Sequence, residues 1–336
     1  MKNQNNHRAT CSSSRRKFLK TISASAATFA AIPFISKCSG TGSKNISNFG
    51  GVQIGAISYS WRSMPDYGPY SLLQYALLSG VGSLEARWLE IEEFAGIPEG
   101  PVRRPLPQNY TGGEREEFEA SQTAALQAQR EWRISTPITK FENFRQMYNA
   151  AGVDIHLAKM RPANWSDDEI DYAFRVAKEL NSRGVGEEIG LEACHRLAPF
   201  AEKHSIPAYF HNHGQVGAPG FSFDDYLRIS PMIMLNLDVG HFYGATGINP
   251  ADVLREYHDR IISLHLKDKT GPSSDPPDTN RPFGQGETPL AECLQLIQRE
   301  GWPIVCDIEL EYPIPEGSDA IQEVRKCVEY CKQALL

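Results

Sequence analysis

Short apolar runs alternate with longer amphipathic segments along most of this chain. The runs have the length and composition of buried strands, and the segments between them carry apolar residues at the three- and four-residue spacing of helices. In the C-terminal half, the runs recur about 25 to 45 residues apart, which is the spacing of strand–helix units. The pattern therefore predicts parallel strands joined by helices.

Eight such units can be counted, so we expect an α/β protein with the (β/α)8 TIM barrel fold. Local signals mark two helix starts: Ser166 stands three residues before Glu169 in a capping-box pattern, and Asn249 precedes Pro250. A long polar insertion over residues 95–133 contains a further charged helix. Strands are expected within residues 52–61, 81–88, 153–160, 184–190, 206–214, 232–241, 260–268 and 303–311, and helices within 71–80, 141–152, 166–184, 191–204, 222–230, 249–258, 289–301 and 319–336.

The N-terminus predicts export. The sequence SRRKFLK at residues 14–20 precedes a mildly apolar stretch, and this combination is typical of a bacterial twin-arginine signal. The stretch is too short for a stable membrane span. We therefore expect an export signal over residues 1–38, a linker over 39–50, a barrel over 51–336 and a periplasmic location. Lipid attachment at Cys38 is the second interpretation, because Lys37 stands where a lipobox has a small residue.

Composition narrows the classes of function. The 336 residues are 41% hydrophobic, which is sufficient for one large core, and the net charge of −7 argues against a nucleic-acid backbone as the main partner. Five of the seven cysteines lie beyond the leader, and no CxxC pair occurs. Neither a zinc ribbon nor a disulfide framework is therefore predicted.

Residue types that bind divalent metals stand at the ends of four successive predicted strands. Because the C-terminal ends of barrel strands meet at one mouth, these side chains predict a single metal site. A mixture of imidazole and carboxylate ligands suits manganese, zinc, cobalt or iron better than calcium. Three acids on one face of the last strand would also need a cation to offset their charge. The strand-end residues are His211, His213, Asp238, His241, His265 and Glu309, and the three acids are Asp307, Glu309 and Glu311.

Four motifs carry a resemblance to a known family: D-x-G-H at 238–241, HLKD at 265–268, N-R-x-x-G-x-G-E at 280–287 and IVCDIELE at 304–311. Together they resemble the xylose-isomerase-like TIM-barrel superfamily, the sugar phosphate isomerase/epimerase family. Its members include sugar isomerases, ketose 3-epimerases, inosose dehydratases and endonuclease IV. The resemblance covers roughly residues 50–336.

The resemblance implies a ligand set. In the epimerase branch one metal is held by Glu, Asp, His and Glu at the ends of strands five to eight, which by position correspond to His211, Asp238, His265 and Glu309. His211 departs from that pattern, since the epimerases have a glutamate there that also serves as one of two acid/base groups. The His-Asn-His sequence at 211–213 is instead similar to inosose-dehydratase-like members. His213 competes with His211 for the ligand role.

Further residues are candidates for chemistry. Glu309 is the first choice of general base, because one oxygen can bind metal while the other accepts a proton; His213 and Glu188 are alternatives. His241 resembles the family's substrate-binding histidine, and its alternative role is to orient Asp238. The remaining expected substrate contacts are Lys267, Arg281 and His156, with Lys159 as a further residue at the mouth.

These observations predict a metal-dependent isomerase or epimerase-type enzyme that acts on a carbohydrate or keto-sugar by removing a proton next to a carbonyl. A lyase or dehydratase acting on a keto-glycoside or inosose is the alternative. A carbohydrate-binding barrel without catalysis is a third hypothesis, from a different class. We expect a small-molecule carbohydrate as partner, no nucleic acid and no membrane span; a homo-oligomer is compatible with the chain.

Overall fold

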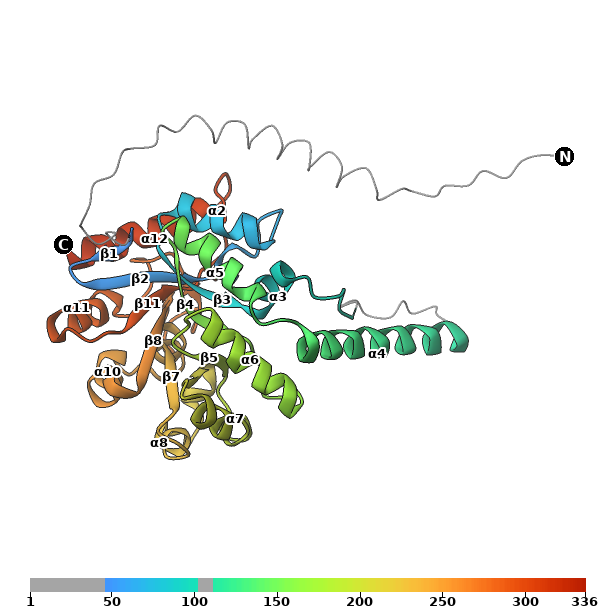
Figure 1. Cartoon of the computed structure of the whole chain (residues 1–336). Helices are drawn as coiled ribbons and strands as arrows, with labels where there is room; N and C mark the ends of the chain where they lie inside the picture. The colour runs from blue at the N-terminus through green and yellow to red at the C-terminus, as the bar shows by residue number, and fades with distance from the viewer. Residues whose placement is uncertain (1–45, 102–110) are drawn as a thin grey trace, which may run out of the picture. The chain divides into compact units, whose positions relative to one another are not determined.

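The computed structural model describes residues 46–101 and 111–336 of the chain (Figure 1). The predicted export signal, Cys38 and most of the predicted linker therefore lie outside the described residues. Residues 46–50 of that linker are described, and they include a short strand, β1 (Asn48–Phe49), which pairs antiparallel with the first barrel strand. No helix among the described residues is long and apolar enough to cross a membrane.

Eight parallel strands form a closed barrel, which confirms the predicted fold class. Each strand pairs with its neighbours in the chain, and the pairing of β2 with both β3 and β11 closes the ring. In the strand register, His265 on β8 pairs with Asp238 on β7 and with Asp307 on β11. These three side chains therefore lie at similar heights along the barrel axis. The strands are β2 (Val52–Ile57), β3 (Ser83–Arg87), β4 (Asp154–Lys159), β5 (Val185–Glu188), β6 (Ala208–His211), β7 (Ile233–Asp238), β8 (Ile261–Leu266) and β11 (Val305–Ile308).

Helices surround the strands (Figure 1). The expected caps form: Glu169 reaches back to the Ser166 backbone N–H and hydroxyl at 3.1 and 2.7 Å, and the Asn249 side chain accepts from the Ala251 N–H at 2.9 Å. The helices are α2 (Pro69–Ser79), α3 (Trp88–Ala95), α4 (Gly112–Ser135), α5 (Lys140–Ala150), α6 (Asp167–Glu179), α7 (Leu191–His204), α8 (Asp224–Leu227), α9 (Val239–Thr246), α10 (Pro250–Tyr257), α11 (Leu290–Glu300) and α12 (Ala320–Leu335).

Some boundaries differ from the predicted ones. The run at 232–241 is a strand only as far as Asp238, because that carboxylate caps α9 and turns the following residues into helix. The helix predicted at 222–230 shortens to the single turn α8. Beyond β8, the chain forms a small hairpin of β9 (Asp268–Lys269) and β10 (Asn280–Arg281) instead of extending the barrel strand.

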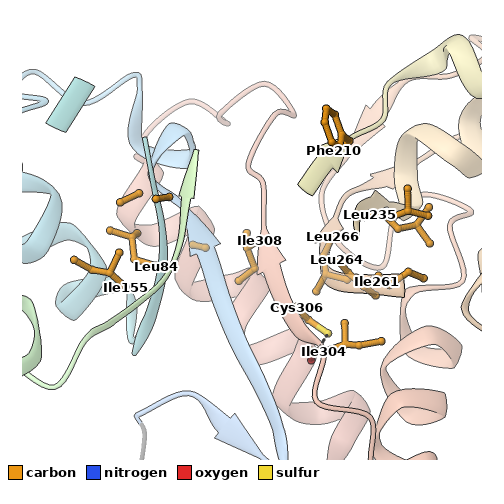
Figure 2. Packing of buried hydrophobic residues seen from close by; sticks show 14 of the residues in the cluster. Leu84, Ile155, Phe210, Leu235, Ile261, Leu264, Leu266, Ile304, Cys306 and Ile308 are labelled. Carbon is orange, nitrogen blue, oxygen red and sulfur yellow. Dashed lines mark hydrogen bonds between the residues drawn. The ribbon is translucent and has the colours of Figure 1, made fainter. Parts of the chain in front are cut away.

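The main apolar core lies between the strands and the helices. Leu84, Phe210, Leu264 and Ile308 are among its fully buried members, and they come from strands around the whole ring (Figure 2). Inside the barrel a much smaller apolar cluster contains Leu157, Tyr209 and Ile262. The outer core therefore supplies most of the hydrophobic stabilisation, and the upper lumen is left for polar side chains.

Candidate metal centre and active site

Three hydrogen bonds run between strands that are not neighbours, so they must cross the barrel lumen. His265 on β8 bonds Glu85 on β3 at 2.5 Å, Tyr209 on β6 bonds the same glutamate at 2.9 Å, and His156 on β4 bonds Asp307 on β11 at 2.9 Å. All five side chains are buried. The lumen thus holds two sets of hydrogen-bonded polar side chains beneath the mouth, one around Glu85 and one at Asp307.

His211, at the end of β6, is presented as a neutral imidazole with a free lone pair. Its Nδ1 lies 2.8 Å from the side-chain oxygen Oδ1 of Asn236. The side-chain Nδ2 of Asn236 donates in turn to the Ser263 hydroxyl at 2.5 Å. Nδ1 must therefore carry the proton, and Nε2 is left buried without a hydrogen-bond partner among the described residues. Burial, with the nearby charges of Lys159 and His265, holds the pKa of His211 well below its usual value.

Asp238 lies at the junction of β7 and α9. One carboxylate oxygen accepts the backbone N–H of His241 at 2.7 Å and so caps α9. The other oxygen has no well-aligned hydrogen bond, although the Lys267 ammonium lies 3.0 Å away. Burial alone would raise the pKa of Asp238, but the charges of Lys267, His241 and His265 together outweigh burial and lower it.

His265 lies between two carboxylates. Its Nδ1 is 2.7 Å from Glu309 and its Nε2 is 2.5 Å from Glu85. Burial opposes protonation, but the two carboxylates outweigh it and raise the pKa of His265 to about 10. The bond to Glu85 is the arrangement that orients a metal-binding histidine, because a carboxylate holding one ring N–H presents the other nitrogen to the ion.

Lys267 places an ammonium group at the centre of the acids. Its Nζ lies 3.0 Å from Asp238, 2.8 Å from Glu309 and 2.9 Å from Glu311. Burial would lower the pKa of this lysine, but the three carboxylates raise it strongly. Burial would raise the pKa of Glu309, but the charges of Lys267 and His265, with the hydrogen bond from His265, hold it well below its usual range. The lysine thus offsets the charge that a divalent cation would otherwise offset.

The predicted ligand set fits a single metal ion. One possible ligand atom from each of His211, Asp238, His265 and Glu309 lies within 4.8 Å of the other three, and all four residues are buried. The donor set combines two imidazoles with two carboxylates, which suits a transition metal. The partnerless Nε2 of His211 is the observation that most directly favours a ligand, because an orphaned buried lone pair is costly.

A second pair of titratable side chains lies at the mouth. His213, just beyond β6, is half exposed, and its Nε2 lies 2.8 Å from Glu188 at the end of β5. Lys159 lies 3.3 Å from the other oxygen of Glu188. Burial would raise the pKa of Glu188, but His213 and Lys159 outweigh it and lower that pKa to about 2. The His213 ring centroid is 4.6 Å from that of His211, so the pair borders the candidate metal centre.

The structure brings His241 to the centre as well. Its two ring nitrogens lie 2.8 Å from the ammonium of Lys267 and 3.3 Å from that of Lys269. Burial and the lysine charges lower the pKa of His241 despite the nearby Asp238. A neutral imidazole has one accepting nitrogen, so His241 accepts from one ammonium group, and the shorter contact is with Lys267.

Two predicted substrate contacts lie elsewhere. His156 bonds Ser83 at 2.9 Å and Asp307 at 2.9 Å deep in the lumen, where it offsets a buried acid. Arg281 belongs to β10, and among the described residues its side chain has no ion pair with the central acids. The structure therefore does not group either residue with the metal ligands.

Asp268 of the HLKD motif has a structural contact. Its carboxylate accepts backbone N–H groups of Gly284 and Gly286 at 2.8 and 2.9 Å. A Cβ on Gly286 would lie 2.2 Å from that carboxylate, so only glycine allows the approach. The two glycines of N-R-x-x-G-x-G-E therefore secure the loop behind the site.

Sequence reasoning missed Glu85, Asn236 and the contact of Glu311 with Lys267. Glu85 was visible only as an acid in an apolar strand, and Asn236 as a polar residue two positions before Asp238. Period-two alternation places Asn236 and Asp238 on one face, which was the available signal. Nothing local indicates that Glu85 bonds a histidine 180 residues away.

A sequence model of the xylose isomerase-like TIM barrel matches residues 147–332. This is more than half of the chain, and the chain belongs to that family. No curated protein matches it in sequence.

Solved structures show the same fold at low identity. An uncharacterized protein from Parabacteroides distasonis has a TM-score of 0.53 and 19% identity, with 84% of this chain and 99% of that chain covered. A sugar phosphate isomerase/epimerase from the same organism has a TM-score of 0.51 and 15% identity over 83% and 97%. The probable 3-DHS dehydratase AsbF from Bacillus anthracis has a TM-score of 0.53 and 12% identity over 83% and 98%. At such identities the likeness concerns the fold alone.

Proposed function

We propose that the chain is a metal-dependent enzyme of the isomerase/epimerase type that removes a proton next to the carbonyl of a carbohydrate or keto-sugar. The observation that supports this most is the convergence of His211, Asp238, His265 and Glu309 at one barrel mouth, with the partnerless Nε2 of His211 among them. Family membership is consistent with the proposal.

The four residues would hold a manganese, zinc, cobalt or iron ion. Such an ion supplies Lewis-acid polarisation of a carbonyl oxygen, which makes the neighbouring C–H more acidic. Asn236 and Glu85 would orient the two imidazoles by the hydrogen bonds that they already make. Lys267 and His241 would hold substrate oxygens, since both present polar atoms at the same centre.

Two groups are suited to move the proton. Glu309 is ionised at neutral pH because Lys267 and His265 lower its pKa, so it can accept a proton from carbon. His213 donates its Nε2 proton to ionised Glu188, which leaves Nδ1 free to accept a second proton. In isomerisation, the base takes a proton from one carbon and the neighbouring carbon regains one. The His213–Glu188 pair supplies the second acid/base group that the absent epimerase glutamate would otherwise provide.

A lyase acting on a keto-glycoside or inosose is the second candidate. Here Glu309 would remove the proton next to the carbonyl, a carbon–carbon double bond would form, and the departing oxygen would take the Nδ1 proton of a doubly protonated His213. The half-exposed position of His213 favours this role, because a leaving group at the mouth can reach it.

Metal analysis tests the proposal first. Purified protein reconstituted with manganese or zinc should hold about one ion per chain, and Asp238→Asn and Glu309→Gln should each hold much less. Glu316→Gln, an exposed acid on a loop, serves as the matched control and should bind like the wild type. If the wild type holds no metal, or if both site variants keep full metal occupancy, the proposed metal centre is wrong. The non-catalytic carbohydrate-binding barrel would then be the remaining hypothesis.

The reaction class is tested in deuterium oxide. A free ketose, an inosose and a 3-keto-glycoside are each incubated with the reconstituted enzyme. Solvent deuterium in an isomerised product supports the isomerase, and an unsaturated product carrying deuterium supports the lyase. Absence of exchange in every substrate, from protein that does hold metal, would contradict proton abstraction as the first step.

We also propose that the N-terminal signal exports the enzyme by the twin-arginine route, on the pattern at residues 14–20. Replacing Arg15 and Arg16 together with lysine should leave the protein in the cytoplasm, because the route requires the arginine pair and not positive charge alone. Undiminished periplasmic yield of that variant would assign the chain to the general secretory route.

A further inference from the structure

The mouth has a second group of side chains at the ends of β2 and β3, and β2 pairs directly with β11. Tyr59 lies in the short helical turn η1 (Ser58–Trp61) after β2, Arg62 follows that turn, and Arg87 ends β3. The guanidinium carbons of Arg62 and Arg87 lie 4.4 and 5.0 Å from the centroid of the Tyr59 ring. Two cationic groups therefore gather on one aromatic ring at the ends of the first two barrel strands.

Neither guanidinium has an acidic partner among the described residues. Arg87 donates to the Ser58 hydroxyl at 3.2 Å and to the Tyr67 hydroxyl at 2.5 Å, and Arg62 donates to the carbonyl oxygens of Tyr59 and Leu310. Of the acids near Arg87 in sequence, Glu85 bonds His265, and the other is Glu90. It accepts the backbone N–H of Arg87, and its pKa is raised by burial.

Another arginine in the same chain shows the contrast. Arg133 anchors the end of α4 by bonding Glu92 at 2.7 Å and Glu169 at 3.2 Å. Structural arginines inside a protein usually acquire such partners, because an unpaired charge in a half-buried position is costly. Arg87 is half buried and held by hydroxyl groups instead, which fixes its position and leaves its guanidinium without an ion pair.

The group borders the candidate active site. A cavity of about 290 Å³ is lined by Arg62, Glu311 and Tyr312 among others. Glu311 bonds Lys267 at 2.9 Å, so one acid connects the cavity to the centre of the metal site. A substrate held at that site can therefore extend into the cavity and toward the arginines.

We propose that Arg62, Tyr59 and Arg87 form a carboxylate-binding subsite, and that the substrate is a sugar acid or a glycoside that carries one. The inference rests on the proposed function for its location, since the subsite binds the non-reacting end of that substrate. A guanidinium matches a carboxylate through paired N–H donors, whereas a neutral sugar ring would need an open aromatic face. Both guanidinium groups lie close to the Tyr59 ring, so the subsite presents charge more than an aromatic face.

Calorimetry on chelator-treated, full-chain protein tests this without requiring metal or turnover. D-Glucuronate should bind at least about 10-fold more tightly than D-glucose at low salt, and the preference should weaken as salt increases. Arg87→Gln and Arg62→Gln should each remove about 10-fold of glucuronate affinity and leave glucose binding unchanged. Arg87→Lys should retain part of the preference, which separates lost charge from a disturbed fold.

Arg325→Gln is the matched control. Arg325 is an exposed arginine of α12 that donates to the Leu78 carbonyl oxygen, as Arg62 does to that of Leu310. Equal affinity of the wild type for both sugars, or variants no weaker than Arg325→Gln, would overturn the subsite. Tighter binding of glucose 6-phosphate than of glucuronate would overturn the carboxylate assignment. A protein without metal or activity that still shows the arginine-dependent preference would refute only the proposed function.

Discussion

The two halves of the barrel mouth differ in whether their charged side chains have partners of opposite charge. On the half formed by β6, β7, β8 and β11, acids, imidazoles and Lys267 offset one another within a few ångströms. On the half formed by β2 and β3, the guanidinium groups of Arg62 and Arg87 lie near an aromatic ring and have no ion pair among the described residues. The same barrel edge thus presents one half suited to a cation and one half suited to anions.

The halves also differ in burial. The candidate metal ligands are almost entirely buried, whereas Arg62 is exposed and Arg87 is half buried. Between the halves, Arg161 lies 3.7 Å from Glu188, which bonds His213. The proposed proton abstraction would therefore take place on the buried first half, and the proposed carboxylate recognition on the second.

Glu309→Gln should give the largest effect on the first half. It keeps the shape of the side chain but removes the base and one anionic ligand, so turnover should fall by about 10²- to 10⁴-fold. Steady-state rates on whichever substrate exchanges deuterium measure this, with Glu316→Gln as control. A loss of turnover below about 10-fold would mean that His213, and not Glu309, is the general base.

Lys267→Met tests whether the acids of the first half require a cation. Without metal, the variant leaves Asp238, Glu309 and Glu311 facing one another, and the free energy of unfolding should fall by about 3–5 kcal/mol. Added zinc or manganese should restore much of that loss, because a divalent ion supplies the missing charge. Denaturant melts with and without metal measure both quantities.

The control for that experiment is Lys326→Met. Lys326 pairs with Glu323 but its side chain is 65% exposed, so the substitution should change unfolding by less than about 1 kcal/mol. Equal losses for the two lysine variants would mean that the central ammonium has no special role.

Asn236→Ala sharpens the comparison by removing only the group that orients His211. The imidazole keeps its place but loses the bond that fixes its tautomer, so metal affinity should fall by about 10- to 100-fold. Competition with a chelating dye measures the affinity. The anion preference of the second half should stay at the wild-type value, since the two halves share no contact through Asn236.

The smallest effect is expected at the boundary between the halves. The pKa of Glu188 is about 2 in the folded protein and 4.5 as a reference, so its contribution to stability is present above pH 4.5 and is lost as pH falls toward 2. Wild type should therefore exceed Glu188→Gln in stability at pH 6, and the difference should shrink between pH 4.5 and 2. A difference independent of pH would point to packing instead of the His213 and Lys159 contacts.

Much of the fold followed from local sequence. Alternation of apolar runs with amphipathic segments predicted the closed barrel, because strand and helix periods differ and each unit must bury one face. Capping patterns at Ser166 and Asn249 placed helix starts for the same local reason. Metal-binding residue types at strand ends also indicated which side chains would gather, since parallel strands end at one edge.

Tertiary structure decided the rest, because it depends on barrel closure and strand register. Only closure brings Glu85 on β3 to His265 on β8, and only register places Lys267 among three acids from two other elements. His156 lies deep in the lumen and not at the mouth because Asp307 meets it there. No sequence motif marks the arginines of the second half. They stand out only in the tertiary structure, where their guanidinium groups have no ion pair among the described residues. Local patterns therefore determined which main elements form, and long-range packing determined where several of them end and which charges meet.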